Sequence, residues 1–122
     1  MNTAPGNTFQ CEIDKSKDEL NNTVTTVKCH GRIVSDTASQ LRDVVKPLIP
    51  DGGRILVDLT GVEHIDSSGL GVLVSLSKKI REQAGELRLA DLNDDLKTLF
   101  ELTKLDTLFQ IADNRDRGLE SF

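Results

Sequence analysis

The chain is poor in aromatic residues, with no tryptophan, no tyrosine and four phenylalanines among its 122 residues. Proteins that bind single-stranded nucleic acid usually stack the bases on aromatic side chains, so this shortage argues against such a platform. The charge argues the same way, because the formal net charge is −5 at pH 7 and the pI is about 4.9. An acidic protein repels the phosphates of nucleic acids and of anionic lipids. We therefore expect no nucleic acid and no membrane as partner.

Long hydrophobic runs are also absent. No apolar run approaches the roughly 20 residues that a helix needs to cross a bilayer. Residues 1–8 are polar and have neither the basic start nor the apolar centre of a signal peptide. We therefore expect a cytoplasmic protein in which a disordered segment, residues 1–7, precedes one domain over residues 8–122. That length suits a single hydrophobic core.

Cysteine and histidine are scarce, with two of each. Cys11 and Cys29 both lie in strand-like segments, and their sulfurs would approach each other if those strands pair as a hairpin. In a reducing compartment we interpret both as small buried hydrophobic residues. His30 and His64 stand alone, with no other ligand at metal-binding spacing, so we predict neither a metal nor another cofactor.

Hydrophobic periodicity predicts strands and helices in alternation. The predicted strands cover residues 8–14, 23–30, 54–59, 87–90 and 108–111. Predicted helices begin at residue 37, at residue 67 or 68 and at residue 93 or 94, and a weak last helix covers 113–122 with Gly118 interrupting it. Such an order predicts an α/β fold with a mostly parallel sheet, in which the opening hairpin is the antiparallel part.

Glycine, proline and capping residues predict where these strands and helices begin or end. Gly31 is expected to end the second strand, and Thr60-Gly61 to turn the chain after the third. Thr37 opens a capping-box pattern with Gln40, with Ser35 and Asp36 as competing caps. Pro47 should kink or end that helix near Val45–Lys46. Gly85 is the expected stop of the next helix.

The most informative stretch is Asp66-Ser67-Ser68-Gly69-Leu70-Gly71, where a buried strand leads into an amphipathic helix. The first turn of a helix has backbone N–H groups without partners and the positive end of the helix dipole. A phosphate added to a serine there would be accommodated. Asp and Ser are also favoured at any helix N-cap, so spacing alone favours an ordinary cap, with Ser68 as one candidate.

The sequence gives less support to two other functions of this stretch, nucleotide binding and catalysis by a serine nucleophile. A dinucleotide-binding pattern needs a third glycine where Val74 stands, and no Gly-Lys-Ser/Thr loop is present. Gly69 and Gly71 are better explained by the close approach of a neighbouring backbone or of a docking partner. His64 is the only histidine near the serines, and no Gly-x-Ser-x-Gly motif surrounds them, so we do not expect an enzyme.

Several segments resemble the STAS domain of bacterial anti-sigma-factor antagonists. They are Gly31–Val34, Ile55–Val62, Ile65–Gly71 and Gly85–Leu89, and the similarity continues through 102–105 to 108–111. The resemblance covers nearly the whole chain from about Thr8. It implies a single STAS domain with a mixed, mostly parallel sheet of four to five strands and helices packed mainly on one face.

The resemblance also implies a mechanism. Unphosphorylated members bind an anti-sigma factor that is itself a serine protein kinase, and so release a sigma factor for transcription. The kinase then phosphorylates the first serine after the aspartate, here Ser67 with Ser68 as the alternative, and the antagonist dissociates. A phosphatase restores binding, and the protein is expected to be a monomer or a weak dimer. Family members often carry an aspartate where this chain has Val34, with Asp36 two positions later.

The expected partner surface combines the helix start with the 34–37 loop, because a parallel sheet places both at the same end. It consists of Val34, Ser35, Asp36, Thr37, Asp66, Ser67, Ser68, Leu70 and Gly71. The alternative function is a STAS scaffold subunit without a switch, as in lipid-transport or transporter-linked assemblies.

Overall fold

Strands β1 to β5 form one sheet in the computed structural model, which describes residues 8–17, 21–51, 53–120 and 122. The segment predicted to be disordered, residues 1–7, lies outside the described residues. The strands are β1 (Phe9–Lys17), β2 (Thr23–Ile33), β3 (Arg54–Ile65), β4 (Glu86–Ala90) and β5 (Gln110–Ala112). The α-helices are α1 (Ala38–Val45), α2 (Ser67–Glu82), α3 (Asp94–Leu102) and α4 (Arg115–Glu120). Short 3-10 helices cover Lys46–Asp51 and Leu105–Thr107.

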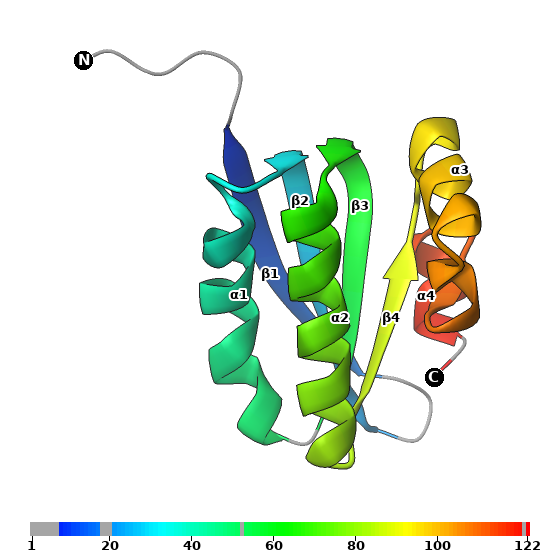
Figure 1. Ribbon diagram of the computed structural model, residues 1–122. Coiled ribbons are helices and arrows are strands. Elements are labelled where there is room, and N and C mark those ends of the chain that lie inside the picture. The colour runs from blue at the N-terminus through cyan, green and yellow to red at the C-terminus, as the bar shows by residue number, and fades with distance from the viewer. Residues whose placement is uncertain (1–7, 18–20, 52, 121) are drawn as a thin grey trace.

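The order of the strands in the sheet is the same as their order in the chain (Figure 1). β1 and β2 form an antiparallel hairpin, whereas β2, β3, β4 and β5 run parallel to one another. Each parallel step needs a crossover, and α1, α2 and α3 supply these crossovers in turn. The prediction of an α/β fold with a mixed, mostly parallel sheet is therefore confirmed.

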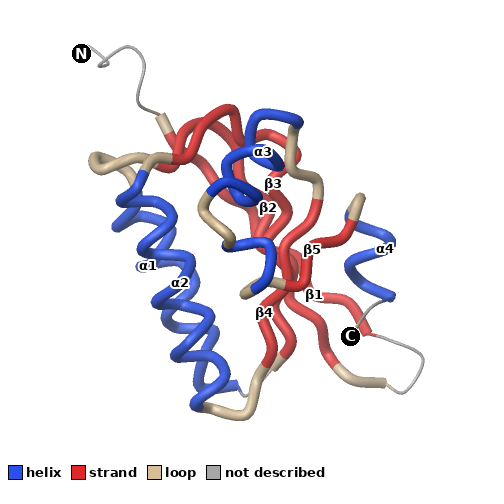
Figure 2. Tube along the Cα trace, turned by 45° about the vertical axis from the view of Figure 1, so that its right-hand side comes forward, coloured by secondary structure: helices blue, strands red, loops and turns tan. Residues whose placement is uncertain are grey.

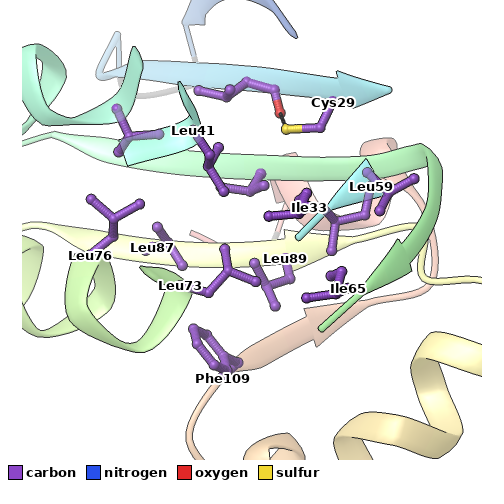
Figure 3. Close-up of a cluster of buried hydrophobic side chains, with 14 of the residues drawn as sticks. Cys29, Ile33, Leu41, Leu59, Ile65, Leu73, Leu76, Leu87, Leu89 and Phe109 are labelled. Carbon is purple, nitrogen blue, oxygen red and sulfur yellow. Dashed lines mark hydrogen bonds between the residues drawn. The ribbon is translucent and has the colours of Figure 1, made fainter. Parts of the chain in front are cut away.

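The helices are divided unequally between the two faces of the sheet. α1 and α2 lie side by side on one face, and α4 lies on the other, as Figures 1 and 2 show. The larger core lies under α1, α2 and α3, where Leu73 and Leu76 of α2 meet Leu87 and Leu89 of β4 (Figure 3). The smaller core lies under α4 and contains Val24, Leu56 and Ala90. No helix in the described part of the chain is long and apolar enough to cross a membrane.

Strands β1, β2 and β3 extend further than the sequence predicted. β1 continues to Lys17 through residues predicted to be a turn, and β2 continues through Gly31 to Ile33. The predicted turn at Thr60-Gly61 is wrong, because β3 runs on to Ile65. Between Asp58 and Gly61 the register shifts against β2, so the Thr-Gly pair marks a β-bulge.

The helix ends show one confirmation and two corrections. α1 ends at Val45 just before Pro47, as predicted. Gly85 is not the left-handed stop of α2; Ala84 is, with φ of 61°. Gly118 does not interrupt α4 but lies buried within it, since a Cβ there would be 2.7 Å from a Leu56 methyl group. A small residue lets this helix approach the sheet closely.

The last strand is displaced from its prediction. β5 covers Gln110–Ala112, whereas residues 108–111 had been expected. Phe109 instead points into the larger core, where its ring meets that of Phe100 edge to face at 5.9 Å between centroids. Leu108 is largely exposed. Both residues therefore precede the strand, and only Phe109 covers the core.

Candidate functional site

The start of α2 lies at the carboxyl end of β3, and the two elements are joined by Asp66 alone. Asp66 is the N-cap, in extended conformation with φ of −96° and ψ of −174°. Its Oδ1 atom accepts a hydrogen bond from the Gly69 backbone N–H at 3.0 Å. Asp66 therefore takes the capping role for which Ser68 had been a candidate, and both Ser67 and Ser68 are exposed residues of the first turn.

Asp66 also ties α2 to the loop after β2. Its second carboxylate oxygen, Oδ2, accepts a hydrogen bond from the Ser35 backbone N–H at 3.0 Å. The Asp66 backbone N–H in turn donates to the Ile33 carbonyl at 3.2 Å. These contacts place the 34–37 loop beside the serine pair, as the parallel arrangement of β2 and β3 predicted.

The charge of Asp66 is stabilised by the backbone around it. The N–H of Gly69 does most to hold the pKa of the Asp66 carboxyl below its usual value. Partial burial opposes this effect, while the N–H groups of Ser35 and Ser68 and the nearby His64 lower the pKa further. A negative charge is thus already present at the positive end of the α2 dipole.

The 34–37 loop is held from within by Thr37. Its hydroxyl accepts a hydrogen bond from the Val34 backbone N–H at 3.0 Å and donates to the Arg32 carbonyl. Because the hydroxyl is used in this way, Thr37 makes no side-chain cap for α1, and the predicted capping box is not formed. Thr37 therefore fixes the shape of the loop rather than the start of the helix.

The two glycines of the motif have different surroundings. A Cβ at Gly69 would lie 2.3 Å from the carbonyl oxygen of Ile33, so only glycine allows α2 to pack this closely on β2. A Cβ at Gly71 would meet no atom within 4 Å, and Gly71 is exposed. The close approach of a neighbouring backbone therefore explains Gly69, and no packing contact explains Gly71.

The predicted site residues divide into a surface and its support. Ser35, Asp36, Ser67, Ser68 and Gly71 are exposed, and Asp66 is half-buried beneath them. The remaining members are buried, with exposed fractions of 7% at Val34, 1% at Thr37 and 9% at Leu70. We call the five exposed residues the serine surface. A partner would contact the serine surface directly, while the buried residues position it.

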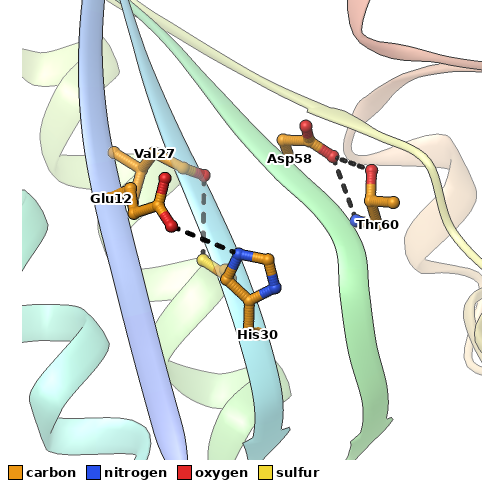
Figure 4. A network of polar contacts seen from close by, with 6 residues as sticks. Glu12, Val27, His30, Asp58 and Thr60 are labelled. Atoms are coloured by element: carbon orange, nitrogen blue, oxygen red, sulfur yellow. Dashed lines mark hydrogen bonds and ion pairs between the residues drawn. The ribbon is translucent and has the colours of Figure 1, made fainter.

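A separate polar cluster lies on the side of β3 that faces α4, away from the serine surface. Asp58 is buried, and its Oδ1 accepts hydrogen bonds from the N–H and the hydroxyl of Thr60 (Figure 4). Burial, and then a hydrogen bond shared with Asp58, raises the pKa of Asp91. Sequence patterns did not indicate this cluster, since the two aspartates are far apart in the chain.

The remaining candidate groups do not gather into a site. His30 forms an ion-pair contact with Glu12 across the hairpin, with 3.9 Å between Nε2 and Oε1 (Figure 4). Cys11 and Cys29 are direct partners in the antiparallel register, both as free thiols, and burial raises the pKa of each. Among the described residues, no three His, Cys, Asp or Glu side chains are grouped to hold a metal ion.

Comparisons with known proteins agree on one family. The family model described as "STAS domain" matches residues 15–118. The anti-sigma-B factor antagonist of Bacillus subtilis is 33% identical over 94 residues, which cover 77% of this chain and 86% of that protein. The anti-sigma-B factor antagonist of Listeria monocytogenes is 37% identical over 82 residues, which cover 66% of this chain and 72% of that protein.

A solved structure extends the similarity over almost the entire fold. The crystal structure of an anti-sigma factor antagonist from Mycobacterium paratuberculosis superposes with a TM-score of 0.80, covering 98% of this chain and 97% of that one. Sequence identity between the two is 23%, so this likeness concerns the fold alone.

Proposed function

This chain belongs to the STAS domain family, and from that premise we propose that it is an anti-sigma factor antagonist controlled by phosphorylation of Ser67. In its unphosphorylated form it binds an anti-sigma factor that is a serine protein kinase, and a sigma factor is released. Phosphorylation by that kinase ends the complex, and a phosphatase restores it. The chain itself acts by binding and not by catalysis.

The exposure of Ser67 on a rigidly held helix start carries this proposal. Its hydroxyl lies in the first turn of α2, open to a kinase, while Asp66 beside it is fixed by hydrogen bonds to two segments. A kinase must reach the hydroxyl without unfolding its substrate, and a docking partner needs a preformed surface. The serine surface meets both requirements.

The proposed control works through charge. A phosphate brings about −1.5 to −2 charges at neutral pH. The positive end of the α2 dipole tolerates them, so the fold is retained. Ionised Asp66 already places one negative charge beneath the serine surface, and the phosphate adds negative charge and bulk where the partner must sit. Binding is therefore lost while the domain stays folded.

The site of modification is tested with the kinase and ATP. We expect intact-mass analysis to find one added phosphate on the wild-type chain and on Ser68→Ala, and none on Ser67→Ala. The two variants are matched, because both serines are exposed and adjacent in the first turn. Phosphate that persists in Ser67→Ala and disappears in Ser68→Ala would move the site to Ser68.

The charge mechanism is tested by binding. Ser67→Asp should weaken the complex with the anti-sigma factor at least tenfold and leave the thermal midpoint within about 2 °C of wild type. Equal affinity of both forms would contradict it. A partner that co-purifies permanently, with no phosphorylation of any serine, would instead support the scaffold function.

A further inference from the structure

A groove runs between α1 and α2 and begins at the serine surface. Its volume is about 350 Å³, and Ser68 and Gly71 line it at one end. Lys79 lines the other end and lies about three turns after Ser68 along α2. Arg42 and Lys46 line it from the α1 side. In Figure 1 the two helices lie side by side and nearly parallel to each other. The residues of α2 that line the groove extend from Ser68 to Lys79.

The groove is positively charged although the chain is acidic. Its lining contains Arg42, Lys46 and Lys79 and no carboxylate, whereas the whole chain has a net charge of −5. Lys46 and Lys79 are exposed. Arg42 has Asp43 beside it, with 3.7 Å between Nε and Oδ1, but both side chains are largely in solvent and such a pair is weak. The side chains that line the groove therefore carry a net positive charge.

Gly71 leaves space in the groove because it has no side chain. Glycine in the interior of a helix costs roughly 1 kcal/mol relative to alanine. At Gly69 a close contact with β2 explains the glycine, but at Gly71 no atom of the chain occupies the space that a Cβ would fill. The missing side chain leaves room for an atom that does not belong to this fold.

We propose that this groove binds an acidic segment of the anti-sigma factor, in continuity with the contact at the serine surface. The inference rests on the proposed function. The three basic side chains select carboxylates, and the half-buried Val72, which also lines the groove, accepts an apolar side chain between them. Gly71 allows the backbone of the segment to pass close to α2.

Binding in the groove would also be weakened by phosphorylation of Ser67. Ser68 lines the groove and Ser67 precedes it in the same helical turn, so a phosphate on Ser67 adds its charge near this end of the groove. The phosphate repels an acidic segment directly and reduces the positive potential that attracts it. One modification thus acts on both parts of the interface.

Charge reversal tests the proposal on the full chain, with the kinase-type anti-sigma factor encoded in the same genome as the probe. Lys46→Glu/Lys79→Glu should weaken binding at least tenfold at 50 mM NaCl, and the loss should shrink at 300 mM NaCl because salt screens exposed charges. The matched control is Lys78→Glu/Lys97→Glu, two exposed lysines outside the groove with the same change of net charge. The control should bind within threefold of wild type.

The outcomes are distinguishable. Equal losses in the two double variants, or wild-type affinity in Lys46→Glu/Lys79→Glu, would overturn the groove and leave the proposed function standing. A wild-type chain that does not bind the anti-sigma factor would overturn both. Gly71→Gln is a second test without a change of charge: it should weaken binding at both salt concentrations while the thermal midpoint stays equal to or rises above that of wild type. Unchanged affinity would contradict the proposal.

Discussion

Asp66 accepts hydrogen bonds from Gly69 and from Ser35, and so connects two segments that come from different strands. The side chain at this position thus has two tasks that need different atoms. Oδ1 caps α2, and an asparagine could do the same. Oδ2 receives the Ser35 N–H, which the amide group of an asparagine cannot do. The carboxylate is therefore required for the shape of the serine surface.

Substitution of Asp66 should show this in the pH dependence of stability. The folded pKa of Asp66 lies below its value in the unfolded chain, so the ionised group stabilises the fold above about pH 4. That contribution is lost as the pH falls through the folded pKa. We expect Asp66→Asn to lower the free energy of unfolding by about 1 kcal/mol at pH 7, and the difference from wild type to shrink as the pH falls below about 4.

Urea denaturation at several pH values measures this difference. Glu63→Gln, an exposed carboxylate on β3, is the control and should follow the wild-type curve closely. A gap between Asp66→Asn and wild type that stays constant from pH 7 to pH 2.5 would mean that the ionised state of Asp66 does not account for the difference in stability.

The two glycines of the motif form a matched pair for a second measurement. Gly69→Ala places a methyl group 2.3 Å from the Ile33 carbonyl oxygen, which must push α2 away from β2. We expect a loss of about 2 kcal/mol, typical of overpacking. Gly71→Ala meets no atom and should stabilise the helix by up to about 1 kcal/mol. Equal effects of the two substitutions on the unfolding midpoint would contradict this assignment.

At the scale of elements, the helices were easier to predict than the ends of the strands. The stripe of Leu73, Leu76 and Ile80 is buried as helical spacing predicted, and Asn93 caps α3 through a hydrogen bond from the Leu96 N–H at 2.8 Å. Helices depend on local spacing, which a sequence displays directly, whereas the Thr37 cap and the Gly85 stop were predicted wrongly. The extension of β3 through Gly61 depends on pairing with β2, which no local pattern reports.

The same distinction applies to the candidate site. The serine pair and its place at a helix start were visible in the sequence, and so was the proximity of the 34–37 loop. The hydrogen bond between Asp66 and Ser35 was not, because it joins segments whose distance depends on the register of β2 and β3. The burial of Val34 and Leu70 and the α1–α2 groove likewise arise only when the elements pack.

The conformation of Ala84 at the end of α2 predicts how a substitution there changes the stability of the protein. Ala84 has φ of 61°, a left-handed conformation that favours glycine. The Gly85 N–H donates to the Ile80 carbonyl at 2.9 Å and the Ala84 N–H donates to the Arg81 carbonyl at 3.0 Å, which together form a Schellman motif. Ala84→Gly should therefore stabilise the protein by about 0.5–1 kcal/mol.

Thermal unfolding tests this substitution, with an expected rise in the midpoint of a few degrees. Ala38→Gly is the control, because Ala38 is the first residue of α1 and its alanine is not in the left-handed region. That control should lower the midpoint. A lower midpoint for Ala84→Gly as well would show that the backbone strain at residue 84 is negligible.

At the scale of the whole molecule, the proposed partner surface lies on one face of the sheet and α4 covers the other face. α1 and α2 cover one face and carry the groove and the serine surface, while α4 closes the other face over Val24, Leu56 and Ala90. The α4 face adds hydrophobic burial and a contact in which the Arg88 guanidinium lies 4.8 Å from the centre of the Phe122 ring. The sheet separates the two faces, so we expect loss of packing under α4 to leave the proposed partner surface unchanged.

A substitution in α4 should therefore separate stability from binding. Leu119 packs against the smaller core and is half-buried, so Leu119→Ala should lower the free energy of unfolding by about 1–2 kcal/mol. Its affinity for the anti-sigma factor should stay within twofold of wild type at a temperature where the variant is folded. Leu102→Ala is the control, since Leu102 is 78% exposed and should change neither quantity. If Leu119→Ala weakened binding as strongly as Ser67→Asp does, the two faces would be coupled, and α4 would have to be counted as part of the binding site.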